Sequence, residues 1–329
     1  MMLKLLLTHT PEMRRQYYGE RALAALRNLV EVRLHEGDEA LSPADLVAAA
    51  RDVDLILADR LTTGPGEIFA QLPALKAILR CAVDIRNIDV EAASAAGVLV
   101  TRATPGFVTS VCELAIGYLV DLSRSISRAT ADYQAGRVPE VQMGRQLASS
   151  TLGIVGYGAI GRQLAPIALA LGMKVLIADP YARVDDERIA QVPFEDLLAG
   201  SDYVVCLAVA TEETENLMGK DAFARMKPSA YFLNLSRGNL VDEAALAAAL
   251  ADGTIAGAAL DVGRAPDQMP TPAIAGLANV IATPHIGGLT PPAIEHQAFD
   301  TVEQVAALAR GEVPHGAVNH DHWTRRLTV

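Results

Sequence analysis

The sequence predicts an α/β protein with two doubly wound parallel sheets, and three observations lead to this fold class. The chain has 329 residues, which exceeds one ordinary core and favours two domains of about 150 residues each. Short apolar runs alternate with helical stretches over the first hundred residues, and a second such series begins at Thr151. Strands separated by helices form parallel βαβ units, so each series predicts one doubly wound sheet.

The first series contains five strand candidates and three helix candidates. The strand candidates are Lys4–Thr8, Glu31–His35, Asp54–Ala58, Lys76–Cys81 and Val98–Thr101. The helix candidates are Glu20–Leu29, Pro43–Arg51 and Val90–Ala96. Ser42 is a suitable cap for the second helix, and Gly97 ends the third. A long helical stretch, Phe107–Thr130, follows, and the polar segment Gly136–Gly144 after it is interpreted as a linker.

The second series contains six strand candidates and four helix candidates. The strand candidates are Thr151–Val155, Lys174–Ala178, Tyr203–Leu207, Tyr231–Leu235, Ala256–Leu260 and Val280–Ala282. The helix candidates are Ile160–Leu171, Phe194–Ala199, Lys220–Met226 and Glu243–Ala251. One more helix, Ala293–Arg310, lies in the tail. Because this tail is too small to form a domain, we expect it to pack on the N-terminal one.

A glycine-rich turn begins the second series and predicts a dinucleotide site. Gly156, Gly158 and Gly161 stand between the first strand and its helix. In such a turn one glycine makes the bend, one lets the backbone approach a pyrophosphate, and one lets the helix pack close to the strand. The pyrophosphate then lies over the free N–H groups of the helix, here those of Ala159 and Ile160.

Asp179 ends the second strand of this series and indicates which dinucleotide is bound. It lies 18 residues after Gly161, near the spacing of about 20 expected for an acid that binds a ribose diol. A carboxylate there repels a 2′-phosphate, so the predicted cofactor is NAD rather than NADP. The six strands fit the six-stranded Rossmann sheet.

Composition excludes several classes of function and location. The net charge is −11 and the pI is about 5.1, which argues against a nucleic-acid partner because such proteins concentrate Lys and Arg. Met1–Leu7 is too short for a secretion signal, and no stretch approaches the roughly 20 apolar residues of a membrane helix. The three cysteines show no paired spacing, and the histidines near the C-terminus match no standard metal site. We therefore expect a cytoplasmic protein without metal or membrane partner.

Two further motifs follow predicted strands, at the edge where open α/β sheets bind ligands. They are Ser236-Arg-Gly-Asn-Leu-Val-Asp-Glu243 and Thr283-Pro-His-Ile-Gly-Gly288. Together with the glycine turn, Ala259-Leu-Asp-Val262 and Asn87-Ile-Asp89, they make the chain similar to the D-isomer-specific 2-hydroxyacid dehydrogenases over nearly its whole length. Phosphoglycerate, hydroxypyruvate and D-lactate dehydrogenases are members of this family.

The resemblance implies hydride transfer between NAD and C2 of a small 2-hydroxy or 2-oxo acid. His285 would be the general base, because imidazole titrates near neutral pH. Arg237 would bind the substrate carboxylate and polarise the C2 oxygen through its planar donor fork. Asp261 would contact the nicotinamide carboxamide, with a turn-forming role as the alternative. The other implied cofactor contacts are Thr211, Leu235, Ser236 and Gly288.

The resemblance also implies a domain organisation and an oligomeric state. The NAD-binding Rossmann domain, 102–289, would be inserted in a flavodoxin-like substrate domain formed by 1–101 and 290–329. The protein would be a homodimer. The helix Val111–Ile126 is a candidate dimer element, and a helix buried within its own domain explains the same pattern.

The chain departs from the family near the histidine. Relatives place a glutamate shortly after the Asp-Val step, where it partners the histidine, and here no glutamate occurs between Asp261 and Glu295. Asp267 is the nearest acid, and we hypothesise that it takes this role. A non-catalytic NAD-binding sensor or partner-binding protein on the same fold is the alternative, and it is supported by the missing glutamate and by the altered substrate loop.

The second departure is in the substrate loop, which is normally rich in glycine. Here it contains Val83, Asp84 and Arg86, which we predict to be substrate-binding. An anionic side chain repels an anionic substrate unless it is paired. Asp84 could pair with Arg86 or bind a polar group of the substrate, or both side chains could face solvent. We predict a substrate with a polar or cationic substituent rather than a second phosphate.

Overall fold

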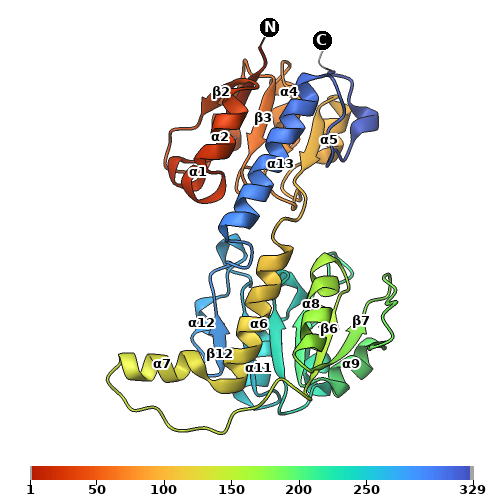
Figure 1. The fold of residues 1–329 in the computed structure, drawn as a ribbon. Coiled ribbons are helices and arrows are strands. Elements are labelled where there is room, and N and C mark those ends of the chain that lie inside the picture. Colours follow the sequence, from red (N-terminus) through yellow and green to blue (C-terminus); the bar gives the residue numbers. More distant parts are fainter. Residues whose placement is uncertain (1, 327–329) are drawn as a thin grey trace. The chain divides into compact units, whose positions relative to one another are not determined.

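The structure is a computed structural model that describes residues 2–326. The chain divides into two compact units (Figure 1). The first unit contains the residues up to Phe107 and those from Leu289 onward, and the second contains residues 108–288. The second unit is thus one continuous segment inserted into the first.

The first unit has a five-stranded parallel sheet in the order β2-β1-β3-β4-β5, the flavodoxin-like order. Its strands are β1 Lys4–Leu7, β2 Glu31–Leu34, β3 Leu55–Ala58, β4 Ala77–Arg80 and β5 Leu99–Arg102. Its helices are α1 Pro11–Tyr17, α2 Glu20–Arg27, α3 Pro43–Ala50, α4 Glu67–Gln71, α5 Val90–Ala95 and α13 Pro291–Ala309. The Ser42 side chain caps α3 by accepting a hydrogen bond from the main-chain N–H of Asp45.

Alternate residues of these strands point to opposite faces and form two apolar cores. Leu5 and Leu7 pack with α2 and α13 on one face, and Leu6 packs with α3, α4 and α5 on the other. The tail joins the first of these cores through Trp323, whose indole N–H donates to the Lys76 carbonyl at 3.1 Å. The tail therefore packs on the N-terminal sheet, as expected.

The second unit has a seven-stranded parallel sheet in the order β12-β11-β10-β9-β6-β7-β8. Its strands are β6 Thr151–Val155, β7 Lys174–Ala178, β8 Ile189–Gln191, β9 Tyr203–Cys206, β10 Tyr231–Asn234, β11 Gly257–Leu260 and β12 Val280–Ala282. The expectation of six strands is wrong by one. The extra strand, β8, is three residues long at the sheet edge, and only Ile189 in it is buried, so it leaves no apolar run in the sequence.

Helices cover both faces of this second sheet. One face carries α9 Phe194–Gly200, α10 Lys220–Arg225, α11 Glu243–Ala251 and α12 Pro272–Ala275. The glycine turn leads into α8 Ala159–Ala170, which contacts α6 Val108–Arg124. Val111, Cys112, Ala115, Leu119 and Leu122 of α6 are buried within the unit, which supports an intradomain role for this helix.

The expected continuous helix over 107–130 is broken at one residue. Ser125 has a left-handed backbone (φ 55°) and separates α6 from α7, Ile126–Gln134. The segment 136–144, interpreted as a linker, is instead a loop inside the second unit. α7 and this loop project from the unit (Figure 1). Their exposed apolar side chains are Ile126, Tyr133, Val138, Val141 and Met143, and we call α7 with residues 135–146 the arm.

Two further expectations from composition are tested by the structure. Cys81, Cys112 and Cys206 are free and buried, as expected for small core residues. None of the helices among residues 2–326 combines the length and the apolar character needed to cross a membrane.

Candidate active site

The candidate site residues of the second unit lie where its parallel strands end. All strands of this sheet run in the same direction, so their carboxyl ends meet at one edge. The residues that follow these ends are Gly156 after β6, Asp179 after β7, Thr211 beyond β9, Arg237 after β10, Asp261 after β11 and His285 after β12.

The turn between β6 and α8 has the geometry that a bound pyrophosphate needs. Gly156 has φ 98°, and a Cβ there would lie 2.7 Å from the Ala208 nitrogen. A Cβ on Gly161 would lie 2.5 Å from the Gly156 carbonyl oxygen, so α8 packs too closely on the strand for a side chain. Gly158, in contrast, faces open space and has no side-chain cap to offer α8. The free N–H groups of α8 therefore remain available to an anion.

Asp179 is held in place by the turn. Its carboxylate accepts hydrogen bonds from the main-chain N–H groups of Tyr157 (2.7 Å), Tyr181 (2.8 Å) and Ala182 (2.8 Å). Burial opposes the charged form, but these hydrogen bonds and the nearby Arg162 prevail and lower the pKa of Asp179. The side chain is therefore an anion beside the glycine turn, the position and charge that suit a ribose diol.

Three other predicted cofactor residues lie beside this turn and β10. Ser236 donates its hydroxyl to the Ala208 carbonyl at 2.6 Å, and Leu235 is buried beneath it. Thr211 is exposed and its main-chain N–H donates to Thr214 Oγ1 at 2.8 Å. The polar groups of Ser236 and Thr211 are thus already engaged within the loops after β9 and β10, and their contact with a cofactor stays a prediction.

Asp261 organises the loop that carries the histidine. Its carboxylate accepts hydrogen bonds from the Thr283 hydroxyl (2.6 Å) and from the main-chain N–H groups of Ile286 and Gly287 (2.8 Å each). The residue is 3% exposed. These contacts support the turn-forming alternative for Asp261, and its contact with nicotinamide stays a prediction. Gly288 follows this loop directly.

His285 is held by its main chain and its ring. Its N–H donates to the Asp261 carbonyl at 3.0 Å, and its φ is 56°. Its ring Nδ1 lies 2.7 Å from the main-chain oxygen of Asp267. A carbonyl oxygen can only accept, so Nδ1 carries a proton, and Nε2 of the neutral ring is left with a lone pair. This tautomer is the one that a general base needs at Nε2.

The hydrogen bond between Asp267 and His285 corrects the expected pairing in one respect. The expected partner was the Asp267 carboxylate, and the ring hydrogen bond is accepted by the Asp267 main-chain carbonyl instead. Asp267 and Gln268 have φ values of 57° and 60°, and this left-handed pair turns the carbonyl toward the ring. Six non-glycine residues among 2–326 have positive φ, and three are Asp267, Gln268 and His285. Such backbone strain concentrates at functional sites.

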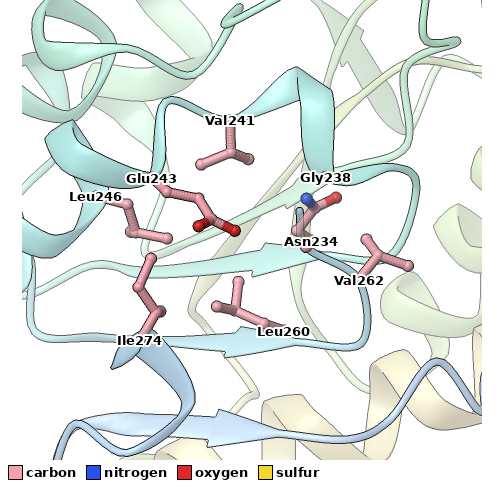
Figure 2. A pocket seen from close by; sticks show the side chains of 9 residues that line it. Asn234, Gly238, Val241, Glu243, Leu246, Leu260, Val262 and Ile274 are labelled. Carbon is pink, nitrogen blue, oxygen red and sulfur yellow. The ribbon is translucent and has the colours of Figure 1, made fainter. Parts of the chain in front are cut away.

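Arg237 stands at the end of β10, directly before the 3₁₀ turn Gly238–Leu240. Its guanidinium donates to the Ser236 carbonyl at 2.7 Å, and the Asn234 side-chain amide donates to the Arg237 carbonyl at 3.0 Å. A small cavity lies behind this segment, and Figure 2 shows the side chains of Asn234 and Glu243 turned toward it. Polar side chains of Asn234 and Glu243 therefore line the cavity next to the Arg237 segment.

The predicted substrate residues of the first unit form their own cluster after β4. Arg86 pairs with Asp84 through Nη2 to Oδ2 at 2.7 Å and Nε to Oδ1 at 3.0 Å. The hydrogen bond with Asp84 raises the pKa of Arg86. The buried Arg80 donates to the Asp84 carbonyl at 3.1 Å and so holds this loop, in which Val83 is partly exposed. Of the alternatives considered for Asp84, the structure therefore shows the ion pair with Arg86.

Several residues that support the site were missed by the sequence analysis. Tyr118 on α6 contacts the Thr283 hydroxyl, which in turn donates to Asp261. Burial raises the pKa of Tyr118, so its phenol stays protonated. The Gln268 side chain accepts from the main-chain N–H of Gly238 through Oε1 at 3.4 Å. No local pattern marks these residues, since each acts across a distance in sequence that only the fold closes.

One group of potential metal ligands lies in the first unit, away from these loops in sequence. Asp300, Glu303 and His315 have ligand atoms within 4.8 Å of one another. His315 Nε2 lies 2.7 Å from Asp300 Oδ1, and Asp300 also accepts from the Thr104 main-chain N–H at 2.7 Å. These hydrogen bonds account for the arrangement of the buried Asp300 without an ion.

Comparisons with known proteins bear on what these loops bind. The family model of the D-isomer specific 2-hydroxyacid dehydrogenase NAD binding domain matches residues 116–287, which lie within the second unit. D-lactate dehydrogenase with NAD⁺ from Lactobacillus jensenii has a similar structure, with a TM-score of 0.81 and 28% identity. That match covers 96% of this chain and 99% of the other. The second unit is thus an NAD binding domain, and its glycine turn and Asp179 fit the cofactor.

Two curated relatives extend the similarity to the whole chain. D-3-phosphoglycerate dehydrogenase of Mycobacterium leprae is 36% identical over 92% of this chain and 57% of its own length. Glyoxylate reductase of Korarchaeum cryptofilum is 33% identical over 92% of this chain and 93% of its own length. The chain thus spans little more than half the length of the first relative and nearly the full length of the second. It belongs to the D-isomer specific 2-hydroxyacid dehydrogenase family.

Proposed function

We propose that this protein is an NAD-dependent D-2-hydroxyacid dehydrogenase that acts on a small 2-hydroxy or 2-oxo acid. The observation that carries the proposal is the contact between the His285 ring and the Asp267 carbonyl. The Asp267 carbonyl at 2.7 Å fixes the proton on Nδ1 and leaves Nε2 as the acceptor for a substrate hydroxyl proton. A protein that only senses NAD has no need of such a base.

NAD supplies the hydride chemistry when it is bound, and the chain supplies orientation and proton transfer. His285 would take the hydroxyl proton at Nε2 in oxidation and return it in reduction. Arg237 would bind the substrate carboxylate and stabilise charge on the C2 oxygen, as a planar guanidinium does. Asp261 would serve His285 indirectly by holding the loop 283–287 in its conformation.

We infer that the substrate carries a polar substituent rather than a second phosphate. The Asp84–Arg86 pair neutralises the one arginine of the exposed part of this loop. A second phosphate would have to compete with Asp84 for Arg86 and would meet its negative charge. A small oxoacid with a hydroxyl substituent, such as hydroxypyruvate, carries only its carboxylate charge and avoids this additional repulsion.

Activity assays test this proposal directly. The purified protein is mixed with NADH and a panel of glyoxylate, pyruvate, hydroxypyruvate and phosphohydroxypyruvate, and loss of NADH absorbance is followed. We expect turnover with a small oxoacid and a fall of about 10³-fold in His285→Gln. NADH binding, measured by fluorescence, should be unchanged in that variant. Preference for phosphohydroxypyruvate would contradict the substrate inference, and turnover that survives in His285→Gln would contradict the assigned base.

The non-catalytic alternative loses its main support from this geometry. It depended on the missing glutamate and the altered substrate loop, and the Asp267 carbonyl makes the contact with the ring in place of the glutamate. The same assay separates the two functions, because a sensor would bind NADH and reduce none of the oxoacids.

We also infer that the protein forms a homodimer through the arm. Tyr133 (66% exposed), Val138 (86%), Val141 (98%) and Met143 (100%) gather on α7 and the loop after it. An exposed apolar patch of this kind is typical of an interaction surface. A second copy of the chain presents the same patch, as two-fold symmetric interfaces require.

A further inference from the structure

Arg264 stands in the segment where relatives are expected to place their acidic partner of the histidine, and its contacts give it a different role. The loop 261–270 follows β11 and folds back on itself. Gly263 N–H donates to the Gln268 carbonyl at 2.7 Å, and Ala265 N–H donates to the Met269 carbonyl at 2.9 Å. The turn at the end of this fold presents the Asp267 carbonyl to His285. The position of this loop therefore fixes the orientation of the imidazole.

The Arg264 guanidinium connects this loop to the segment that carries Arg237. Its Nε and Nη2 donate to the Val241 carbonyl at 3.1 Å and 3.0 Å, and Nη2 also donates to the Asn239 carbonyl at 3.1 Å. Asn239 lies in the 3₁₀ turn 238–240 that directly follows Arg237. One side chain thus binds main-chain oxygens on both sides of Leu240.

The same guanidinium also reaches the segment before α10. Nη2 lies 2.8 Å from Glu215 Oε1 and 2.6 Å from Asn216 Oδ1. The main-chain N–H of Arg264 donates to Glu243 Oε1 at 3.0 Å, and Glu243 lines the cavity of Figure 2. The Nε–Nη2 edge of the guanidinium faces all of these acceptors, with the two hydrogens of Nη2 shared among four of them. An ammonium group does not reproduce this planar edge.

The two connected segments also touch directly. A Cβ on Gly238 would lie 2.0 Å from the Gly263 carbonyl oxygen, so the backbones of the two loops are in contact at that point. A shift of loop 261–270 would therefore displace both the Arg237 segment and the carbonyl that orients His285.

The geometry points to Arg264 as a positioning residue that sets Arg237 and His285 relative to each other. This inference rests on the proposed dehydrogenase function. Arg264 touches neither reacting atoms nor the predicted cofactor residues, and it acts through the main chain of the two loops. Since misplacement by about 1 Å can cost about 10²-fold in rate, loss of this connection should slow hydride transfer more than it weakens NADH binding.

The test compares wild type, Arg264→Met, Arg264→Lys and the control Arg188→Met with the oxoacid found active in the panel. Arg188 pairs with Asp186 on the surface of the same unit and has no contact with either loop. We expect kcat of Arg264→Met to fall by about 10- to 100-fold and the primary isotope effect with 4-deuterated NADH to rise. The NADH Kd and the thermal unfolding midpoint should match those of Arg188→Met. Guanidinium at millimolar concentration should restore part of the activity in Arg264→Met, and Arg264→Lys should remain impaired.

Three outcomes would overturn the inference. They are unchanged kcat and isotope effect in Arg264→Met, full activity in Arg264→Lys, and a loss of rate that follows NADH affinity or thermal stability. The last would show a merely structural role. Wild-type turnover in the same assays is the condition that separates these outcomes from failure of the proposed function, which would abolish activity in every protein of the set.

Discussion

At the scale of single residues, Asp267 shows how a side-chain role can pass to the main chain. The family resemblance predicted that its carboxylate would contact the His285 ring. In the structure its main-chain carbonyl makes this contact. A neutral carbonyl orients the imidazole and fixes its tautomer without adding a full negative charge beside it. The backbone conformation of Asp267 is therefore one determinant of how the imidazole is oriented.

Substitutions at Asp267 test this assignment. Its φ is 57°, a conformation that Asn adopts readily and that a β-branched residue resists. Asp267→Asn should keep kcat/KM within about threefold of wild type, whereas Asp267→Val should lower it by about tenfold or more through loss of the turn. Steady-state kinetics across pH measure both. A changed pH profile in Asp267→Asn would show that the carboxylate, and not the carbonyl, governs the base.

His9 makes the free energy of unfolding of the first unit depend on pH. It is 1% exposed, follows β1 and packs on the Tyr18 ring with 5.4 Å between centroids. Burial lowers the pKa of His9 to about 4, against 6.5 in the unfolded chain. Between these values the unfolded chain binds a proton that the folded chain does not, so stability falls as pH drops from about 6.5 to 4. The expected loss from this group is about 3 kcal/mol.

Trp323 makes this prediction measurable in the first unit alone. It is the one tryptophan of the sequence and belongs to the same core as Tyr18. Urea unfolding followed by its fluorescence should show a steeper loss of stability toward pH 4 in wild type than in His9→Gln. Parallel curves for the two proteins would mean that His9 does not titrate as inferred.

At the scale of elements, the sequence predicted most strands to within one or two residues because parallel strands form apolar runs bounded by turns. β6, β7 and β12 have the predicted bounds. It missed β8, and it missed the short helices α1, α4 and α12, whose few residues repeat no period. The sequence did not predict the break between α6 and α7, because a serine with a left-handed backbone leaves no signal in the composition.

The residues of the candidate site also fall into those that the sequence could predict and those that it could not. Residues that follow strand ends could be picked from motifs, because the parallel fold fixes where they lie. The contacts of Tyr118, Arg264 and Gln268 could not, since they depend on how segments far apart in sequence come together. The atom by which Asp267 reaches His285 depends on two backbone angles that no motif records.

The glycine turn offers a matched pair of substitutions. Gly156→Ala should lower both stability and NADH affinity, because its left-handed backbone costs about 1–2 kcal/mol and its Cβ meets backbone at 2.7 Å. Gly158→Ala should leave the melting temperature nearly unchanged, since its Cβ meets nothing within 4 Å, and should weaken NADH binding by about tenfold by filling the approach to the pyrophosphate. Thermal unfolding and NADH fluorescence titration distinguish the two. Equal losses of stability would contradict the separate roles.

At the scale of the whole molecule, the arm is the feature that the proposed dimer explains. Light scattering should give wild type a mass twice that of the 34.8 kDa chain. Val141→Asp combined with Met143→Asp should give the mass of one chain, because charges at a buried interface are costly. Val313→Asp, a change of an exposed valine in the first unit, is the matched control. A wild-type monomer, or a double variant that still pairs, would exclude the arm as the interface.

The insertion of one unit into the other has a consequence for how the protein is made. Residues 108–288 form a continuous unit, which can acquire its structure while the ribosome is still adding the residues after Gly288. The first unit cannot, because Val305, Leu308 and Trp323 complete its core and follow the second unit in the chain. The strands of the first sheet therefore wait until these residues have also been translated, and the exposed apolar face of that nascent sheet is where chaperones would be needed most.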